Sequence, residues 1–403
     1  MPGVTLEDIK RANRVVEGAI HRTRLEYSKT FSAICGGEIY LKTENLQRTG
    51  SFKIRGALNK IASIPPEERE RGVIAASMGN HAQGVAHASQ IAGIKCTIVM
   101  PETASITKVV ATRGYGAEVV LHGREYDEAY GKALEIQREK GYTYIHAFDD
   151  PYIIAGQGTI GLEILEKLPE MDQVVVPVGG GGLISGIAVA LKETNPRIKV
   201  YGVEAENMPA MKASLERGTI VPLAMGSTIA DGIAIKSPGT LTFDLTRRYV
   251  DGVVTVTEEE IAGTILLLLE RAKLVVEGAG AVALAACLHG KVNCKGKKTV
   301  AVLSGGNIDT NMVSLIIERG LVKEGRYLNV STIIKDQVGE LKGLLALIVE
   351  EKANVITIRH DRIKLDVPIG YARVELLLET WGKEHSERIL RAMRERGFQV
   401  TLP

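Results

Sequence analysis

Short β-branched segments alternate with amphipathic segments over the first three quarters of the chain. The β-branched segments that we predict to be strands are 38–41, 73–75, 95–99, 117–121, 173–178, 199–203 and 298–303. Helical patterns lie between them at 56–63, 81–91, 105–113, 126–140 and 183–193. This alternation predicts an α/β fold with parallel sheets and right-handed crossovers. Because such sheets bind ligands beyond the carboxyl ends of their strands, the segments after Ala76, Val178 and Leu303 are candidate binding loops.

The pattern changes near residue 326 to the order β-α-β-β-α-β. The expected strands are 327–335, 355–359, 372–380 and 398–402, and the expected helices are 339–351 and 384–396. This order is typical of a ferredoxin-like unit. A chain of 403 residues also exceeds what one compact core usually holds. We therefore predict a large domain at 1–323 and a separate C-terminal domain at 327–403.

The charge balance argues against two classes of partner. Lys and Arg total 50 against 48 Asp and Glu, a net charge of +2, which favours neither nucleic acid nor an anionic membrane surface. The uncharged run 174–191 is interrupted by Pro177 and four glycines, so we expect a buried strand, loop and helix rather than a membrane span. The N-terminus lacks the apolar segment of a signal peptide, and the four cysteines show no metal-binding spacing. These features predict a cytoplasmic protein with reduced thiols.

A lysine stands at the start of a predicted helix, in the segment T-G-S-F-K-I-R-G-A at 49–57. The positive potential of a helix N-terminus lowers the pKa of an amine there and favours the neutral, nucleophilic form of Lys53. A lysine that forms a Schiff base needs this property. Most single lysines are solvated surface residues, so the interpretation depends on the other motifs.

Four consecutive glycines lie between a predicted strand and a predicted helix, in V-G-G-G-G-L at 178–183. Their backbone N–H groups can converge on an anion at the helix N-terminus, although glycines also permit tight packing of helix on strand. The spacing fits neither a P-loop nor a dinucleotide fingerprint. We expect a phosphate monoester at this loop.

Two further strand-to-helix turns carry polar groups. In S-M-G-N-H-A-Q-G at 77–84, the side chains of Ser77, Asn80 and His81 and the local N–H groups can hold a carboxylate. Their alternative roles are a helix cap and turn hydrogen bonds. The turn L-S-G-G-N at 303–307 would, by itself, be an ordinary capped turn.

Together, the motifs S-F-K-x-R-G, S-x-G-N-H, G-G-G-G-L and S-G-G-N resemble the serine/threonine dehydratase family of pyridoxal phosphate (PLP) enzymes. The resemblance covers residues 1 to about 323, and T-I-A-D-G-I-A at 228–234 is also similar to threonine dehydratases. It implies the two-lobed fold type II architecture, like that of the tryptophan synthase β-subunit, with a small lobe at about 47–147. The implied reaction is dehydration of L-threonine to 2-oxobutanoate and ammonia, with L-serine as a second substrate.

The resemblance also implies residue roles, with Lys53 as the catalytic residue and the covalent attachment point of PLP. The implied cofactor contacts are Phe52, Lys53, Asn80, Gly179, Gly180, Gly181, Gly182, Leu183, Glu277 and Ser304. The implied contacts of the substrate carboxylate are Ser77, Gly79, Asn80 and His81. Ser304 would lie at the pyridine nitrogen, where a hydroxyl cannot hold that nitrogen protonated. This arrangement favours prompt elimination over transamination.

Several alternatives remain open at this stage. Serine racemases resemble this pattern but carry a second serine near the position of Ser77, where this chain has Met78. A serine-preferring dehydratase differs by one methyl group of substrate, worth only about 1–3 kcal/mol of discrimination. An amino-acid sensor with a silent active site is a third alternative, which the intact Lys53 argues against.

A cation is a separate question. Many relatives bind a divalent ion through two acidic side chains, of which Glu204 matches the first, whereas the second position holds Ala210. We therefore predict no divalent metal site and leave a monovalent cation open.

The C-terminal region at 327–403 resembles an ACT domain, a regulatory fold that binds amino acids between paired copies. The matching motif is D-Q-V-G-E-L at 336–341, which implies an effector site at Asp336, Gly339 and Leu341. The alternative is a dimerisation module without an effector. Biosynthetic threonine dehydratases sense isoleucine, the end product of their pathway, through a larger C-terminal region than this single copy, and catabolic forms often carry none. This chain matches neither pattern fully, so a branched-chain amino acid is one implied effector, and the identity of the effector and a biosynthetic or catabolic role stay open. Pairing of copies implies a homodimer or a homotetramer.

Overall fold

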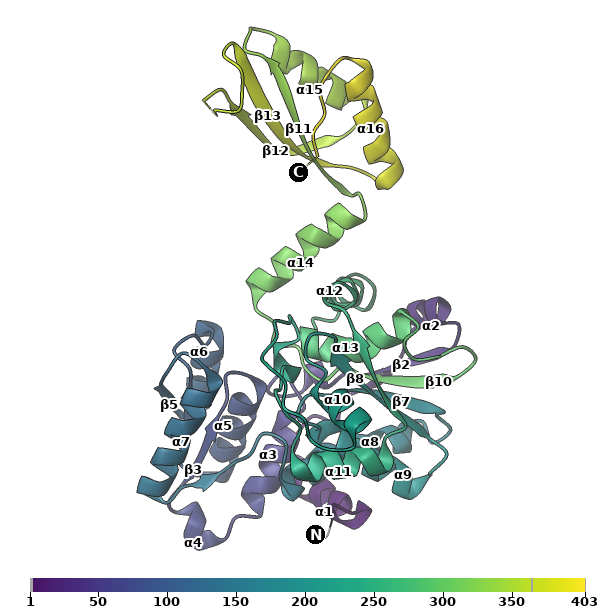
Figure 1. Cartoon of the computed structure of the whole chain (residues 1–403). Helices are drawn as coiled ribbons and strands as arrows, with labels where there is room; N and C mark the ends of the chain where they lie inside the picture. The colour runs from purple at the N-terminus through teal and green to yellow at the C-terminus, as the bar shows by residue number, and fades with distance from the viewer. Residues whose placement is uncertain (1–2, 364, 403) are drawn as a thin grey trace. The chain divides into compact units, whose positions relative to one another are not determined.

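The computed structural model describes residues 3–363 and 365–402 and divides the chain into two compact units, Met1–Asp309 and Thr310–Pro403 (Figure 1). The division falls before helix α14 (Thr310–Lys323), whereas the sequence pattern places it after residue 323. The sequence of a helix between two domains does not indicate to which of the two domains the helix belongs. Among the described residues, none of the helices combines the length and apolar character needed to cross a bilayer.

The first unit contains a four-stranded parallel sheet in the order β5-β4-β3-β6. Its strands are β3 (Val73–Ala76), β4 (Cys96–Met100), β5 (Glu118–Leu121) and β6 (Thr143–Tyr144). The helices that belong to this region are α3 (Lys53–Ala62), α4 (Pro66–Arg69), α5 (Asn80–Ala92), α6 (Ile106–Gly114) and α7 (Tyr126–Lys140).

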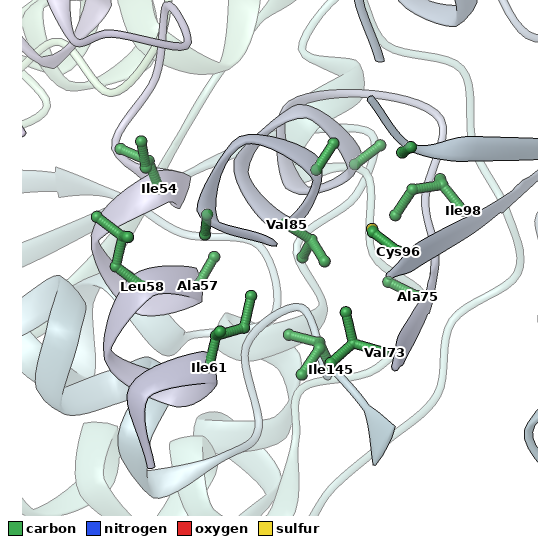
Figure 2. Packing of buried hydrophobic residues seen from close by; sticks show 14 of the residues in the cluster. Ile54, Ala57, Leu58, Ile61, Val73, Ala75, Val85, Cys96, Ile98 and Ile145 are labelled. Atoms are coloured by element: carbon green, nitrogen blue, oxygen red, sulfur yellow. The ribbon is translucent and has the colours of Figure 1, made fainter. Parts of the chain in front are cut away.

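Alternate residues of strand β3 serve two different hydrophobic cores. Val73 and Ala75 pack with Ile54, Ile61 and other residues of α3 and α5 (Figure 2). The intervening Ile74 and Ala76 pack instead with α7. A strand buried on both faces is expected in a parallel sheet covered by helices on each side. This packing holds the start of α3, which carries Lys53, against the four-stranded sheet.

A six-stranded sheet in the same unit has the order β1-β2-β10-β7-β8-β9. Its strands are β1 (Leu25–Tyr27), β2 (Glu38–Lys42), β7 (Gln173–Pro177), β8 (Lys199–Ala205), β9 (Gly252–Val256) and β10 (Lys298–Val302). All neighbours pair in parallel except β1 and β2. The remaining helices are α1 (Leu6–Val16), α2 (Lys29–Cys35), η1 (Glu44–Leu46), α8 (Pro151–Lys167), α9 (Gly182–Thr194), α10 (Ala210–Arg217), η2 (Asp231–Ile233), α11 (Thr240–Tyr249), α12 (Glu258–Leu267), η3 (Leu268–Ala272) and α13 (Gly278–Leu288).

The predicted α/β fold with parallel sheets is confirmed. Strands β1, β6 and β9 were not predicted; β1 and β6 have only 3 and 2 residues, too few to show a periodic pattern. Strand β10 pairs with both β2 and β7, although it follows them by more than a hundred residues. The carboxyl ends of β7 and β10 therefore lie at the same edge of the sheet, where two of the predicted binding loops begin.

The second unit has an antiparallel sheet in the order β11-β13-β12. Its elements after α14 are β11 (Tyr327–Lys335), α15 (Glu340–Glu350), β12 (Asn354–Asp361), β13 (Tyr371–Glu379) and α16 (Lys383–Glu395). Helices α15 and α16 lie beside this sheet (Figure 1), and alternate residues of β11 and β13 form a core with them. The predicted last strand, 398–402, is reduced to a single bridge between Ser331 and Thr401. The Phe398 N–H still bonds to Met393 O at the end of α16, so few residues remain for a ladder.

Candidate active site

Lys53 is the first residue of α3, as the sequence predicts, and its amine points to a backbone carbonyl. Lys53 Nζ donates a 2.8 Å hydrogen bond to Ala147 O and lies 5.3 Å from the centroid of the Phe52 ring. Burial lowers the pKa of Lys53 to about 8, opposed by the nearby Glu277 carboxylate. Burial is thus a cause of the low pKa that the sequence does not reveal, in addition to the position of Lys53 at a helix N-terminus. At pH 7 about a tenth of this amine is neutral and nucleophilic, far more than for a lysine with its usual pKa.

The glycine loop makes the turn from β7 into α9 and packs against the segment that contacts Lys53. Gly181 precedes the helix with φ of 94°, a conformation that favours glycine, and offers no side-chain cap to α9. A Cβ at Gly180 would lie 2.4 Å from the Phe148 ring, next to Ala147. Both predicted properties are therefore present: glycine is needed for close packing, and the uncapped first turn of α9 leaves N–H groups for an anion.

Asn80 is held on both sides of its amide by residues from distant parts of the chain. Its Nδ2 donates to Glu277 Oε1 at 2.6 Å, and its Oδ1 accepts from Asn307 Nδ2 at 2.7 Å. Asn307 Nδ2 also donates to Thr49 O at 2.8 Å. This chain of hydrogen bonds joins the loop after β3, the loop after β10 and the start of α13.

Glu277 is a buried carboxyl, with 4% of its surface exposed. Burial, together with the Asp231 carboxylate, raises the pKa of Glu277 to about 7, and the hydrogen bond from Asn80 opposes the rise. Glu277 can therefore exchange a proton near neutral pH beside Asn80. A carboxyl with a strongly shifted pKa that acts electrostatically on a candidate catalytic lysine is typical of a functional site.

The loop after β10 runs beside the lysine segment. Ser304 O accepts from Phe52 N at 3.1 Å, and Ser51 forms a β-bridge with Gly305. Among the described residues, Ser304 Oγ makes only a long hydrogen bond of 3.4 Å to Ala279 O. Its hydroxyl can therefore donate to another acceptor, as the role at a pyridine nitrogen requires.

The turn after β3 offers donors for a carboxylate, but not from the His81 ring. Ser77 Oγ accepts from Gly79 N at 3.3 Å and keeps its own proton to donate. His81 Nε2 lies 2.9 Å from Ile145 O, so that nitrogen carries the proton, and burial lowers the pKa of the ring to about 3. The remaining Nδ1 of a neutral ring only accepts hydrogen bonds. The implied carboxylate contact of His81 is therefore limited to its backbone N–H in the first turn of α5.

Three functional features were missed by sequence reasoning. Ala147 contributes a backbone carbonyl and Phe148 contributes packing, and neither contact is signalled by residue type. Asp231, within a motif quoted for its resemblance alone, forms a 2.7 Å ion pair with Lys108 and acts on the pKa of Glu277.

Glu204, the candidate cation ligand, is used as a helix cap. Its two oxygens accept from Met211 N at 2.8 Å and Lys212 N at 2.9 Å at the start of α10. Burial raises the pKa of Glu204 to about 7. In the part of the chain that the structure describes, His, Cys, Asp and Glu side chains form no group of three suited to a metal ion.

The predicted effector residues lie in the second unit, around the turn from β11 to α15. Gly339 precedes α15 with φ of 100°, and Leu341 packs against the core of this unit. The Asp336 carboxylate lies 3.4 Å from Arg362. All three residues therefore lie at or just before the N-terminus of α15.

Comparison with known proteins gives a family match that spans most of the chain. The profile described as "Pyridoxal-phosphate dependent enzyme" matches residues 16–305. The chain belongs to this family. The predictions of PLP as cofactor and of a PLP-dependent lyase are confirmed.

Two relatives of this PLP-dependent enzyme are named for reactions of L-threonine. An L-threonine ammonia-lyase of Thermotoga maritima is 56% identical over 99% of each chain. The catabolic L-threonine dehydratase of Escherichia coli is 49% identical over 78% of this chain and 96% of its own. Among solved structures, maize serine racemase superposes with a TM-score of 0.76 at 33% identity, covering 80% of this chain and all of that one.

The residues present fit PLP. Lys53 supplies a buried amine of lowered pKa, and the N-terminus of α9 supplies N–H groups for a phosphate. In addition, the Ser51 hydroxyl, two residues before Lys53, is buried with no partner among the described residues. A buried polar atom without a partner is rare in a native site and is consistent with a ligand beside the lysine segment.

Proposed function

We propose that this enzyme is an L-threonine ammonia-lyase, converting L-threonine to 2-oxobutanoate and ammonia. The observation that carries the proposal is the convergence on Lys53 of the Ala147 carbonyl, the Asn80–Glu277 pair and the loop of Ser304. The 56% identity to the Thermotoga maritima enzyme over nearly the whole chain supports threonine as substrate.

Each part of the site has a proposed task. Lys53 attaches the cofactor and then, as a free amine, moves the α-proton of the substrate at its Nζ. When bound, PLP disperses the negative charge that forms on the substrate carbon. Phe52 flanks the ring, Asn80 binds its 3-hydroxyl and Ser304 binds its nitrogen. Gly179 to Leu183 hold the phosphate, with Glu277 fixing the amide of Asn80.

The substrate carboxylate is proposed to bind at the turn after β3. Its donors are the Ser77 hydroxyl and the N–H groups of Gly79, Asn80 and His81. The uncapped N-terminus of α5 favours an anion there, and no arginine is required.

The main alternative reaction is racemisation, because a serine racemase shares the fold. A racemase needs a second proton donor on the opposite face of the substrate. The residue after Ser77 is Met78, whose side chain has no exchangeable proton. We therefore propose elimination as the principal reaction, with L-serine as a second substrate.

The test is formation of 2-oxo acids by the purified enzyme from L-threonine and, in parallel, from L-serine. Rapid 2-oxobutanoate formation is expected from threonine, and the two rates rank the substrates. Chiral analysis of the remaining amino acid measures racemisation in the same samples. Absence of oxo acid from an enzyme that shows the visible absorbance of bound PLP would overturn the proposed reaction.

We further propose that the second unit is an ACT domain that binds a branched-chain amino acid at Asp336, Gly339 and Leu341. Support comes from its ferredoxin-like order of elements and from Gly339 at the N-terminus of α15. Pairing of these units would make the enzyme a homodimer or homotetramer. Calorimetry with isoleucine and valine, and light scattering for mass, test both points. If neither amino acid binds or changes the rate, the regulatory role fails.

A further inference from the structure

Three of the four cysteines lie together at a place away from the residues assigned to catalysis. Cys35 ends α2, Cys287 lies in the last turn of α13, and Cys294 precedes β10. The Cys294 thiol interacts with the thiols of both Cys35 and Cys287. We call these three residues the thiol cluster.

Backbone hydrogen bonds hold the segments of Cys35 and Cys294 next to each other. The chain just after Cys35 is tied to the chain just after Cys294, because Gly36 O accepts from Gly296 N at 2.8 Å and Glu38 N donates to Lys297 O at 2.9 Å. A Cβ at Gly37 would lie 1.9 Å from Cys294 O, so the two segments touch at a position where only glycine fits. The backbone therefore brings together the segments that carry Cys35 and Cys294, as the interaction between their thiols requires.

The surroundings of Cys294 stabilise a thiolate. Hydrogen bonds from Cys287 and Cys35 hold the pKa of Cys294 well below its usual range, aided by Thr299 and the charge of Lys297. Gln173 Nε2 lies 3.8 Å from the Cys294 sulfur and adds a donor. The same contact and burial raise the pKa of Cys35. The Gln173 donor and the nearby Lys297 ammonium therefore favour Cys294 as the attacking thiol of the cluster, since the thiolate is the reactive form of cysteine.

Exposure differs within the cluster in a way that allows access. Cys294 and Cys287 are each 3% exposed, whereas Cys35 is partly exposed. The cluster therefore meets solvent beside Cys35, which is where we expect an oxidant to enter.

We propose that the thiol cluster is a site of reversible oxidation, at which hydrogen peroxide converts Cys35 and Cys294 to a disulfide. The Cys294 thiolate attacks one peroxide oxygen, and the O–O bond breaks to give a sulfenic acid and a hydroxide that becomes water. The Cys35 thiol then attacks that sulfur, the S–S bond forms, and the hydroxyl leaves with the thiol proton as a second water. Two thiols are oxidised and one peroxide is reduced to two waters.

The test oxidises the full-length enzyme with PLP bound, using hydrogen peroxide, and maps disulfides by mass spectrometry after tryptic digestion. Lysines separate the three cysteines into different peptides, so the bond is identified in the parent chain without any substitution. We expect a Cys35–Cys294 cross-link that dithiothreitol reverses, and loss of two of the four thiols. Absence of this cross-link, or a cross-link of Cys294 to Cys287 instead, would overturn the proposal.

Two variants complete the test by comparing rates of thiol loss. Cys294→Ser is expected to slow the loss by about tenfold or more, because the nucleophile is gone. Cys96→Ser is the matched control, since Cys96 lies in the core of α3, α5 and β4 (Figure 2), where burial raises its pKa to about 12. That variant is expected to oxidise as the parent does. Equal rates for Cys294→Ser and the parent would contradict the assignment of the nucleophile.

Discussion

Asn80 and Glu277 lie 197 residues apart in the chain and are joined by a 2.6 Å hydrogen bond from the Asn80 amide to Glu277 Oε1. The bond connects the N-terminus of α5 to the residue that precedes α13. Because Asn307 holds the other side of the same amide, the position of Asn80 depends on three separate parts of the fold. The amide that is proposed to bind the cofactor is thus oriented before the cofactor arrives.

Glu277→Gln is expected to change how stability depends on pH in the cofactor-free protein. Burial raises the pKa of Glu277 to about 7 from its usual 4.5, so the unfolded chain ionises first as pH rises between these values. The parent therefore loses stability over that window, and a glutamine, which still accepts from Asn80, does not. From pH 5 to 8 the variant should gain roughly 1–3 kcal/mol relative to the parent in urea unfolding. A pH-independent difference would contradict the raised pKa.

Arg55→Ala is expected to lower the free energy of unfolding by about 3–5 kcal/mol. The Arg55 guanidinium is fully buried and contacts Glu44 at 2.8 Å and Glu163 at 2.7 Å, and its removal leaves these two buried carboxylates to share the ammonium of Lys42. Arg22→Ala is the control, because Arg22 pairs with Glu166 on the surface, where the expected change is below about 1 kcal/mol. Guanidinium unfolding of both variants measures the contrast, and equal losses would refute the role of burial.

Gly180→Ala is expected to weaken PLP binding and to destabilise the fold by about 1–3 kcal/mol, because its Cβ would meet the Phe148 ring. Gly131→Ala tests the same change at an exposed site within α7, where nothing lies near the added Cβ. That control should gain up to about 1 kcal/mol. Titration with PLP and thermal unfolding report both effects, and normal PLP affinity in Gly180→Ala would argue against this loop as the phosphate site.

Chelation of divalent metal is expected to leave the rate with L-threonine unchanged. Both Glu204 oxygens accept backbone N–H groups at the start of α10, and the second acidic position of relatives is Ala210 here. Assays with EDTA and with added Mg²⁺ measure this directly. A loss with EDTA that Mg²⁺ restores would show that a divalent site exists despite the capping role of Glu204.

Much of the candidate site is predictable from sequence because its motifs are local. Lys53, Asn80, Gly180 and Ser304 each stand in a short strand-to-helix segment, and the order of elements predicts that such segments gather at strand ends. The parallel α/β fold follows from the same alternation, whereas strands of 2 and 3 residues leave no periodic signal.

The remaining features depend on contacts that residue types do not reveal. Ala147 acts through its backbone carbonyl, and His81 loses its ring donor to another carbonyl, that of Ile145. The carboxylate of Glu204 has the chemistry of a metal ligand, and only its position beside α10 makes it a cap. The thiols of Cys35 and Cys294 meet because β2 and β10 are neighbours in the sheet, a pairing that no local pattern predicts.

The assignment of Lys53 as the residue that carries PLP is tested most directly by reduction of the PLP-loaded enzyme with sodium borohydride, followed by digestion and mass spectrometry. Reduction fixes the pyridoxyl group permanently to the amine that carries it. We expect the added pyridoxyl group on Lys53 of the parent enzyme. The Lys53→Ala variant is expected to show no label and no 2-oxobutanoate formation. A pyridoxyl group on any other lysine of the parent enzyme would contradict this assignment.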